Sequence, residues 1–187
     1  MRPWLNRWRR RLAHALLFRM VFGERGRPHT RIAPSTCIEG EAGLELADHV
    51  FIGQFNFIDA SAGLVIEEGV QISNFCSILT HSTHNALRIN GRRFATAGGQ
   101  PPGYVKAPVR LGAYSFVGAH CLIEPGSQLG KGAMLCAYAQ LRGIAPDFAI
   151  MAGQPARQVG DTRVRDAVLL TRHPELREAY EAWAGKP

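Results

Sequence analysis

Cysteine is scarce in this chain of 187 residues, which contains four cysteines and no two of them at Cys-x-x-Cys spacing. Without that spacing a zinc knuckle is not supported. Small secreted domains use cysteines in disulfide frameworks, whereas sparse cysteines suit the reducing cytoplasm. The cysteine usage therefore predicts a cytoplasmic protein.

Long hydrophobic runs are also missing, even within residues 4–22, where apolar side chains are frequent. A membrane-spanning helix needs about 20 mostly apolar residues, and Arg19 interrupts a stretch that is already shorter. The small-residue cleavage site of a signal peptide is missing as well. We therefore expect neither a membrane span nor a signal peptide in this segment.

Acidic residues are nearly absent from residues 1–31, which contain nine arginines and one acid, Glu24. Apolar side chains here recur at helical spacing, at Leu5, Trp8, Leu12, Leu16 and Met20. Two interpretations of this basic amphipathic segment remain open. It packs on the following domain or on a neighbouring subunit, or residues 4–22 lie peripherally on the anionic inner face of the membrane. No recognised nucleic-acid motif accompanies the charge, so we expect no nucleic-acid partner.

What the chain does have is a six-residue rhythm of large aliphatic residues. The rhythm is unbroken at Leu111, Val117, Ile123, Leu129, Leu135 and Leu141. A small residue stands two positions before each next aliphatic, at Ser115, Cys121, Ser127, Ala133 and Ala139. Hexapeptide repeats are typical of a parallel β-helix, in which both kinds of residue point inward. Cys121, and Cys76 at the same position of its repeat, are therefore predicted to be small core residues.

The first half of the chain keeps this rhythm with larger corners. Gly43–Ile52 resembles Gly63–Ile72 at an offset of twenty residues, which is three hexapeptides plus a two-residue insertion. Three six-residue faces close one triangular coil, and coils stack at the ordinary strand spacing of about 4.8 Å. We predict about five coils between Ile32 and Ile150, within one domain over residues 32–160.

The segment that follows this domain, residues 161–187, has a different composition. Its larger apolar residues suggest one or two short helices around Pro174: Leu169, Leu170, Leu176, Tyr180 and Trp183. An open β-helix end exposes unpaired strand edges, which natural proteins cover. Residues 161–187 are therefore predicted to form a helical cap on the last coil.

The rhythm breaks once, at residues 79–108. A β-helix accommodates such an insertion only as an external loop, and long loops on rigid scaffolds usually carry function. The loop contains no acidic residue and four basic ones, Arg88, Arg92, Arg93 and Lys106. It opens with His81 and His84, and an imidazole can act as a general base near neutral pH.

Two segments resemble a known family. Val109–Gly126, with its Pro125-Gly126 pair, and Pro146–Arg157, with the ending Gly-Gln-Pro-Ala-Arg, are similar to the left-handed β-helix acyltransferases. The resemblance is closer to the maltose and galactoside O-acetyltransferase branch and its polysaccharide-modifying relatives, and it covers roughly residues 32–160. Gln154 departs from the asparagine that is usual in the family. The predicted fold class is thus all-β, a left-handed parallel β-helix.

The resemblance implies transfer of an acetyl group from acetyl-CoA to a hydroxyl or amine in a homotrimer, with CoA held between neighbouring prisms. The family's catalytic histidine stands at the start of the loop. The family spacing falls between His81 and His84, and His84 is favoured, with His81 as the alternative. Asn56 resembles a family asparagine near the histidine, although an internal amide ladder explains its inward position equally well.

The resemblance also implies contacts with CoA. Ala119 and Ala137 match coil positions where the family's backbone meets the pantetheine arm. Arg157 matches an arginine placed for the nucleotide phosphates, for which a bidentate guanidinium is suited. Arg142 stands where the family often has a lysine and is a candidate to replace it. No metal is expected.

The function predicted from these features is O-acetylation of a sugar or of a cell-surface or lipid-linked glycan. The charge of the loop indicates an anionic or phosphate-linked acceptor. N-acylation of an amino sugar, or acylation of a serine-type acceptor, is the main alternative. A zinc protein like the γ-class carbonic anhydrases has the same fold, but the spacing of His81, His84 and His120 does not match that class. An inactive scaffold is the last alternative.

Overall fold

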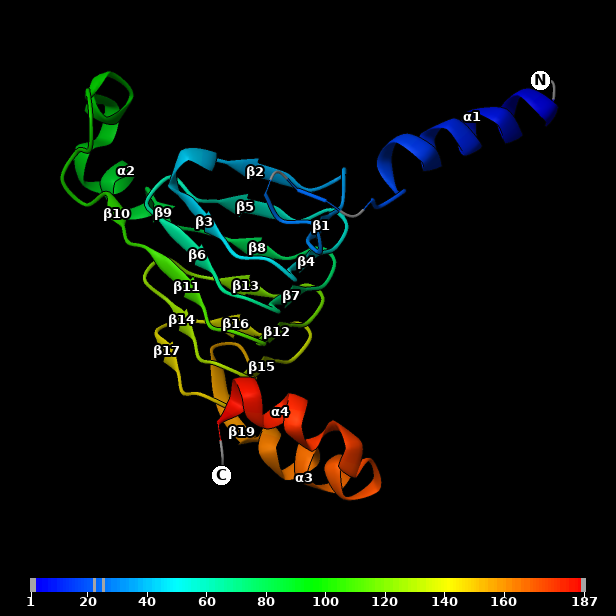
Figure 1. The fold of residues 1–187 in the computed structure, drawn as a ribbon. Coiled ribbons are helices and arrows are strands. Elements are labelled where there is room, and N and C mark those ends of the chain that lie inside the picture. Colours follow the sequence, from blue (N-terminus) through cyan, green and yellow to red (C-terminus); the bar gives the residue numbers. More distant parts are fainter. Residues whose placement is uncertain (1–2, 22, 25, 186–187) are drawn as a thin grey trace.

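The computed structural model describes residues 3–21, 23–24 and 26–185, and its centre is a three-sided prism of stacked coils (Figure 1). Each coil adds one short strand to each of three sheets, and successive coils pair in parallel. The predicted fold class, a left-handed parallel β-helix, is confirmed. The structure also agrees with the prediction of about five coils.

The three sheets form the faces of the prism, and we number them in the order in which the chain visits them. The first face consists of β1 (Arg31–Ile32), β4 (Phe51–Ile52), β7 (Gln71–Ile72), β12 (Phe116–Val117), β15 (Met134–Leu135), β18 (Ala149–Gly153) and β19 (Ala156–Asp161). The second face consists of β2 (Cys37–Glu39), β5 (Phe57–Asp59), β8 (Ser77–Ile78), β13 (Leu122–Ile123) and β16 (Gln140–Leu141). The third face consists of β3 (Leu44–Leu46), β6 (Leu64–Ile66), β11 (Val109–Leu111), β14 (Gln128–Leu129) and β17 (Ile144–Ala145).

Aliphatic side chains of all three faces fill the inside of the prism. The six residues of the rhythm from Leu111 to Leu141 are at most 1% exposed. Because the strands of successive coils pair in parallel, equivalent aliphatic residues lie one above the other, and Ile123 lies between Ile78 and Leu141. Cys76 and Cys121 are free thiols buried in this core, which confirms their predicted role.

Three corners join the faces, and residues with positive φ make the bends. We call the corner between the first and second faces the first corner, and its aromatic residues with positive φ are Phe55, Phe75, His120 and Tyr138. The left-handed conformation is uncommon for non-glycine residues. Here it recurs coil after coil, and the rings stack with centroids 4.7–5.1 Å apart. This aromatic stack supports the conformation at each level of the corner.

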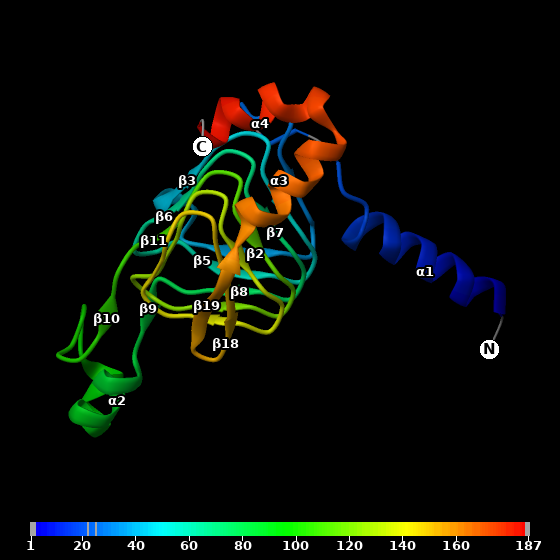
Figure 2. The ribbon, with the colours of Figure 1, turned by 90° about the horizontal axis from the view of Figure 1, so that it is seen from below.

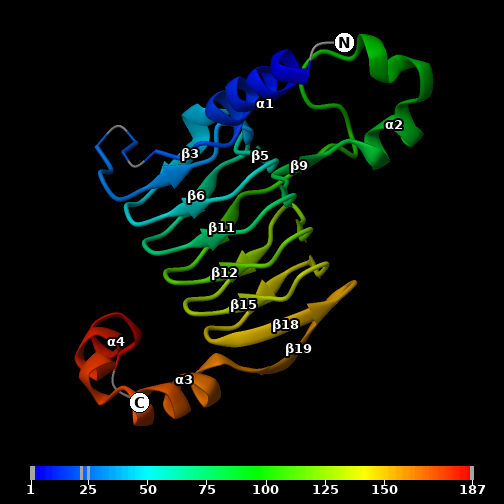
Figure 3. The same cartoon turned by 90° about the vertical axis from the view of Figure 1, so that its right-hand side faces the viewer.

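The predicted external loop leaves the prism at the second corner, between the second and third faces (Figures 1 and 3). Its base is an antiparallel pair of β9 (His81–Ser82) and β10 (Val105–Lys106). Beyond this base lie α2 (His84–Asn90) and a 3-10 helix, Gly91–Thr96. A second 3-10 helix, Glu41–Gly43, lies at the same corner in the first coil.

Helix α1 (Pro3–Leu17) extends away from the prism (Figures 1 and 2). None of its residues is buried, and the chain meets the prism just after it, at Phe18. There the Phe18 ring lies 5.5 Å from that of Phe55, and the Gln54 amide donates to the Phe18 carbonyl oxygen at 3.1 Å. Helix α1 therefore does not pack on its own prism, which leaves a neighbouring subunit or an anionic membrane as the open interpretations. Phe22 of the same segment lies outside the described residues. No described helix has the length and apolar character needed to cross a membrane.

The chain ends in α3 (Thr162–Arg172), a 3-10 helix (Pro174–Leu176) and α4 (Arg177–Ala184), at the end of the prism opposite α1 and the loop (Figure 3). Asp161 starts α3 because its carboxylate accepts from the Arg163 amide at 2.9 Å. Trp183 of α4 stacks on Tyr114 of the third corner, between the third and first faces, at 4.5 Å. These helices lie in residues 161–187, the segment that is predicted to form a cap. Residues 186–187 lie outside the described part of the chain.

Candidate active site at the mouth of the loop

His81 lies where the loop leaves the second corner, on β9, and its Nδ1 is 2.7 Å from Asp59 Oδ2. Asp59 is the last residue of β5, one coil earlier, and its side chain is 1% exposed. The His81 side chain is 34% exposed, so one edge of the ring reaches solvent while the other meets the carboxylate. The fold thus joins a buried acid to an accessible imidazole.

Hydrogen bonds keep the Asp59 carboxyl ionised. Its oxygens accept from the Thr80 amide at 3.0 Å, the Thr80 hydroxyl at 2.6 Å and the Ser61 amide at 2.9 Å. Burial raises the pKa of this carboxyl, but the bonds from Thr80 and Ser61 outweigh that effect and hold the pKa well below its usual range. Asp59 is therefore a carboxylate at neutral pH.

A carboxylate partner fixes the state of the histidine. An ionised carboxylate can only accept, so His81 carries a proton on Nδ1, and in the neutral imidazole Nε2 has the free lone pair. The Tyr104 ring, from the far side of the loop, stacks on the His81 ring with centroids 5.8 Å apart and planes 11° apart. The ring is therefore oriented from two sides, and its Nε2 is able to accept a proton from a substrate.

His84 has a different setting. It is the first residue of α2, it is exposed, and its Nδ1 lies 2.6 Å from the Ser82 hydroxyl. A hydroxyl is a weaker partner than a carboxylate for an imidazole that becomes protonated, because it carries no charge. The two histidines of the loop are thus distinguished by their partners, because within the described part of the chain His81 is bonded to an acid and His84 is not.

Asn56 lies inside the prism at the first corner and is 3% exposed. Its amide nitrogen donates to the Gly53 carbonyl oxygen at 2.9 Å, and its side-chain oxygen accepts from the Cys76 amide at 2.7 Å. The first bond closes the turn that contains Asn56, and the second joins this turn to that of the next coil. This placement fits the structural alternative for Asn56, since its side chain is buried inside the prism and both its nitrogen and its oxygen have partners there.

Ala119 and Ala137 lie at the first corner in adjacent coils, where the Ala119 carbonyl oxygen accepts from the Tyr138 amide at 2.9 Å. The turn between β18 and β19 reaches the same corner, because Gln154 donates to the Tyr138 carbonyl oxygen at 2.6 Å. Arg157 follows this turn on β19 and is exposed. The structure therefore brings three of the predicted CoA-contacting residues to one corner.

Arg142 lies elsewhere, at the second corner, two coils beyond His81 and therefore about 10 Å along the prism. Its Nε is 3.1 Å from Glu124 Oε2, and Gln140 donates to the other oxygen of Glu124. The side chain is 74% exposed. Arg142 shares its corner with His81, but part of its charge is already matched by Glu124.

Within one chain, the predicted residues therefore form two groups. His81, His84 and Arg142 lie at or beyond the second corner, whereas Ala119, Ala137 and Arg157 lie at or near the first. The second face separates the corners, and six extended residues span roughly 20 Å. A single prism does not bring the two groups together.

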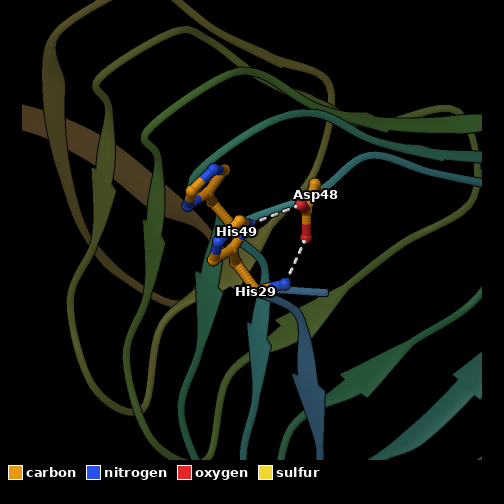
Figure 4. Close-up of side chains that lie close together, drawn as sticks. All are labelled: His29, Asp48 and His49. Atoms are coloured by element: carbon orange, nitrogen blue, oxygen red, sulfur yellow. Dashed lines mark hydrogen bonds and ion pairs between the residues drawn. The ribbon is translucent and has the colours of Figure 1, made fainter. Parts of the chain in front are cut away.

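Potential metal ligands gather at a different corner. Among the described residues, one cluster of ligating side chains is close enough to share an ion: His29, Asp48 and His49, at the third corner (Figure 4). His29 Nδ1 is 2.9 Å from Asp48 Oδ2, and the two imidazoles stack at 4.4 Å with planes 4° apart. Parallel stacked rings do not aim their in-plane lone pairs at one point, so this cluster is better suited to holding residues 29–31 on the prism. His120, the third histidine weighed for zinc, lies in the aromatic stack of the first corner.

Two residues of the candidate site were missed in the sequence, Asp59 and Tyr104. The sequence could have indicated Asp59, because the twenty-residue coil of the first half places it directly beside the Leu79–His81 segment of the next coil. No sequence pattern could have indicated Tyr104, since its position depends on how the loop folds back through the pairing of β9 with β10.

Comparisons with known proteins can be set beside this geometry. No protein-family model matches the chain. A probable acetyltransferase of Mycobacterium tuberculosis is 27% identical over 139 residues, which cover 74% of this chain and 44% of that protein. Serine acetyltransferase 2 of Arabidopsis thaliana is 25% identical over 155 residues, which cover 83% of this chain and 44% of that protein. The chain thus spans less than half the length of these two relatives.

The solved structures include AntD, an N-acyltransferase from Bacillus cereus. One AntD mutant with dTDP and coenzyme A superposes with a TM-score of 0.59 at 17% identity, covering 78% of this chain and 88% of that chain. A second mutant, with dTDP-4-amino-4,6-dideoxyglucose and coenzyme A, gives 0.55 at 16% identity, covering 79% and 88%. Identities this low show a shared fold. By fold and by sequence the chain is therefore similar to acyltransferases in general, and no branch among them is singled out.

Proposed function

We propose that this protein is an acetyl-CoA-dependent O-acetyltransferase that acts on a hydroxyl of a sugar or glycan, with His81 as the general base. The observation that carries the proposal is the bond from His81 to the buried carboxylate of Asp59, at the mouth of a long basic loop. The similarity to acetyltransferases supports the same reaction. The CoA complexes of AntD support CoA as the carrier of the acyl group.

The geometry suggests a simple mechanism. Nε2 of His81 takes the proton of the acceptor hydroxyl while the oxygen attacks the thioester carbonyl of acetyl-CoA. Asp59 stabilises the imidazolium that forms, because its charge lies 2.7 Å from Nδ1. Collapse of the intermediate breaks the carbon–sulfur bond, and the imidazolium returns the proton to the thiolate. The products are the acetyl ester and free CoA.

The donor and base sites suggest an assembly. We propose a homotrimer in which the second corner of one prism faces the first corner of its neighbour. His81 of one subunit then lies beside the Ala119, Ala137 and Arg157 of another. The roughly 20 Å between the two corners of one chain supports such a shared site.

The loop suggests the acceptor. Arg88, Arg92 and Arg93 lie on or directly after α2, Lys106 lies on β10, and the segment contains no acid. Cationic side chains around a pocket favour an anionic ligand. We propose an acceptor that carries phosphate or carboxylate groups. The four free cysteines support a cytoplasmic location for this reaction.

Transfer to an amine is the second candidate function. The observation that favours it is the AntD complex with an amino sugar linked to dTDP, on the same fold. An amine acceptor needs the same base, because a proton leaves the nitrogen as the amide forms. Paired acceptors that differ only in a hydroxyl or an amine at one carbon separate the two functions.

The proposal is tested by following CoA release from acetyl-CoA, with a panel of sugars, phosphosugars and amino sugars. His81→Ala should lower turnover by roughly 10²–10⁴-fold. His84→Ala, a matched removal of an imidazole from the same loop, should lower it much less. If His84→Ala abolishes turnover and His81→Ala does not, His84 is the base. If the double variant keeps normal turnover, this loop is not the site of acyl transfer.

A further inference from the structure

Helix α1 has two distinct sides. With about 100° between successive residues, six of its apolar side chains fall within an arc of about 120°: Trp4, Leu5, Trp8, Leu12, Ala15 and Leu16. The arginines and the other polar residues occupy the rest of the circumference, together with Pro3, Ala13 and Leu17. We call this arc the apolar stripe of α1. Its two tryptophans lie near one edge, and Leu16 lies at the other.

Nothing in the described chain covers the apolar stripe. Trp4 is 62% exposed, Trp8 58% and Leu16 63%, and no residue of α1 is buried. Most helices of a globular protein bury such a stripe against the core, because burial of apolar area supplies most of their stability. A stripe this long that extends away from the prism therefore needs a partner outside the chain (Figure 2).

The charge of α1 indicates the partner. The helix contains Arg7, Arg9, Arg10 and Arg11 and no acidic residue. Among the described residues none of these arginines has an ion-pair partner. Arg9 and Arg11 border the stripe on either side, where long side chains can extend toward lipid headgroups while the stripe lies deeper.

We propose that α1 is an interfacial helix that lies on an anionic lipid surface, with its tryptophans and leucines at the boundary between headgroups and acyl chains. A strongly amphipathic helix with arginines on one face and Trp and Leu on the other has the composition of such anchors. A second copy of α1 is the less suitable partner, because each α1 contains four arginines and no acidic residue, so that two of these helices repel each other. An anionic membrane supplies both the apolar layer and the negative charge.

The position of α1 supports this proposal. Helix α1 precedes the first coil, the basic loop leaves the third coil and reaches toward the same end of the prism, and α3 and α4 lie at the opposite end (Figures 1 and 3). Arg88, Arg92 and Arg93 of the loop add positive charge toward the same end of the prism, which would favour an anionic surface there.

Vesicle binding tests the proposal without reference to catalysis. The full chain is sedimented with vesicles of phosphatidylcholine alone and of phosphatidylcholine and phosphatidylglycerol in equal parts. We expect binding to the anionic vesicles, little binding to the neutral ones, and release as salt screens the charges. Tryptophan fluorescence should shift to the blue on binding, since Trp4 and Trp8 leave water.

A matched pair of variants examines the stripe. Leu12 lies within it and is 44% exposed, whereas Leu17 lies on the opposite side of the helix and is 46% exposed. Leu12→Glu should weaken binding at least about tenfold, because it places a charge below the headgroups, and Leu17→Glu should weaken it far less. Replacing Arg9, Arg10 and Arg11 by glutamine should weaken binding roughly 100-fold. All variants should keep the thermal midpoint of the wild type, because α1 makes no contact with the core.

Three results overturn the proposal. One is equal binding to neutral and anionic vesicles, and another is equal loss with Leu12→Glu and Leu17→Glu. The third is no binding to either vesicle together with a smaller oligomer for Leu12→Glu in sedimentation velocity, which assigns the stripe to a neighbouring subunit.

Discussion

Asp59 and His81 are 22 residues apart in the chain and in contact in the fold. One coil takes twenty residues here, so the end of β5 lies directly beside the point where the loop begins. The buried carboxylate would be costly without partners, and Thr80, Ser61 and His81 all supply them. The pair is thus an ordered arrangement in which a buried carboxylate holds a partly exposed imidazole.

Asp59→Asn should lower turnover by roughly 10²–10⁴-fold. The amide can donate to Nδ1, which moves the proton to Nε2 and removes the lone pair that the acceptor needs. Asp48→Asn is the matched control, because Asp48 binds His29 Nδ1 in the same way at the third corner. Turnover of acetyl-CoA measures both variants, and equal losses would mean that the effect is one of folding.

Asp59 also makes stability depend on pH. Its pKa lies below the ordinary value of 3.8 in the folded chain, so the unfolded chain binds the proton more readily. The stabilisation is fully present above about pH 5 and is lost as the pH falls through 3.8 toward the folded value. We expect the difference in unfolding free energy between wild type and Asp59→Asn to shrink over this range in urea titrations. A constant difference would show that the charge of Asp59 does not contribute to the pH dependence of stability.

At the scale of elements, the strands are too short to be stable alone. Many contain two residues, and those inside the stack, such as β13, are held by parallel neighbours above and below and by one inward aliphatic side chain. The corners are equally dependent on stacking, since the Cβ of any residue at Gly118 would lie 2.5 Å from the Ala137 amide nitrogen of the next coil. Stability therefore resides in the register between coils.

Ile123→Asp should lower the unfolding free energy by at least about 3 kcal/mol, because it places an unpaired charge in the core. Ile123 is 0% exposed, and it packs between two coils. Ile144→Asp makes the same chemical change at a strand position that is 71% exposed. Chemical denaturation should find a small effect there, of about 0.5 kcal/mol or less. Similar losses for both would contradict an inward Ile123.

At the scale of the whole molecule, a single prism keeps the two groups of predicted site residues apart, and the proposed trimer would bring them together between subunits. A trimer should therefore be seen in sedimentation velocity, and a fully active monomer would contradict the shared site. Mixed assembly is a stricter test. His81→Ala lacks the base, and Arg157→Ala should raise the acetyl-CoA concentration needed for turnover with less effect on the saturated rate. Subunits of the two variants, unfolded and refolded together, should regain activity at low acetyl-CoA, and refolding each alone should not.

The sequence by itself determined the prism. A hexapeptide rhythm is a local pattern, and each repeat fixes which side chain points inward without reference to distant residues. The inward positions of Ile123 and Cys121, the coils of eighteen residues in the second half of the prism and the external loop all follow from it. Site residues carried by the same register, such as Ala119 and Ala137, could be assigned to a corner for this reason.

Tertiary structure alone decided what lies outside the register. Two histidines three residues apart look alike in the sequence, and the pairing of His81 with Asp59 depends on which of them stands where the loop leaves the coil. Tyr104 reaches His81 because β9 and β10 pair across a loop of no fixed period. Helix α1 is amphipathic by its sequence, but whether its apolar stripe is covered by the prism depends on the path of residues 18–30. Local periodicity fixes which way a side chain faces, and only the folded chain fixes what it meets.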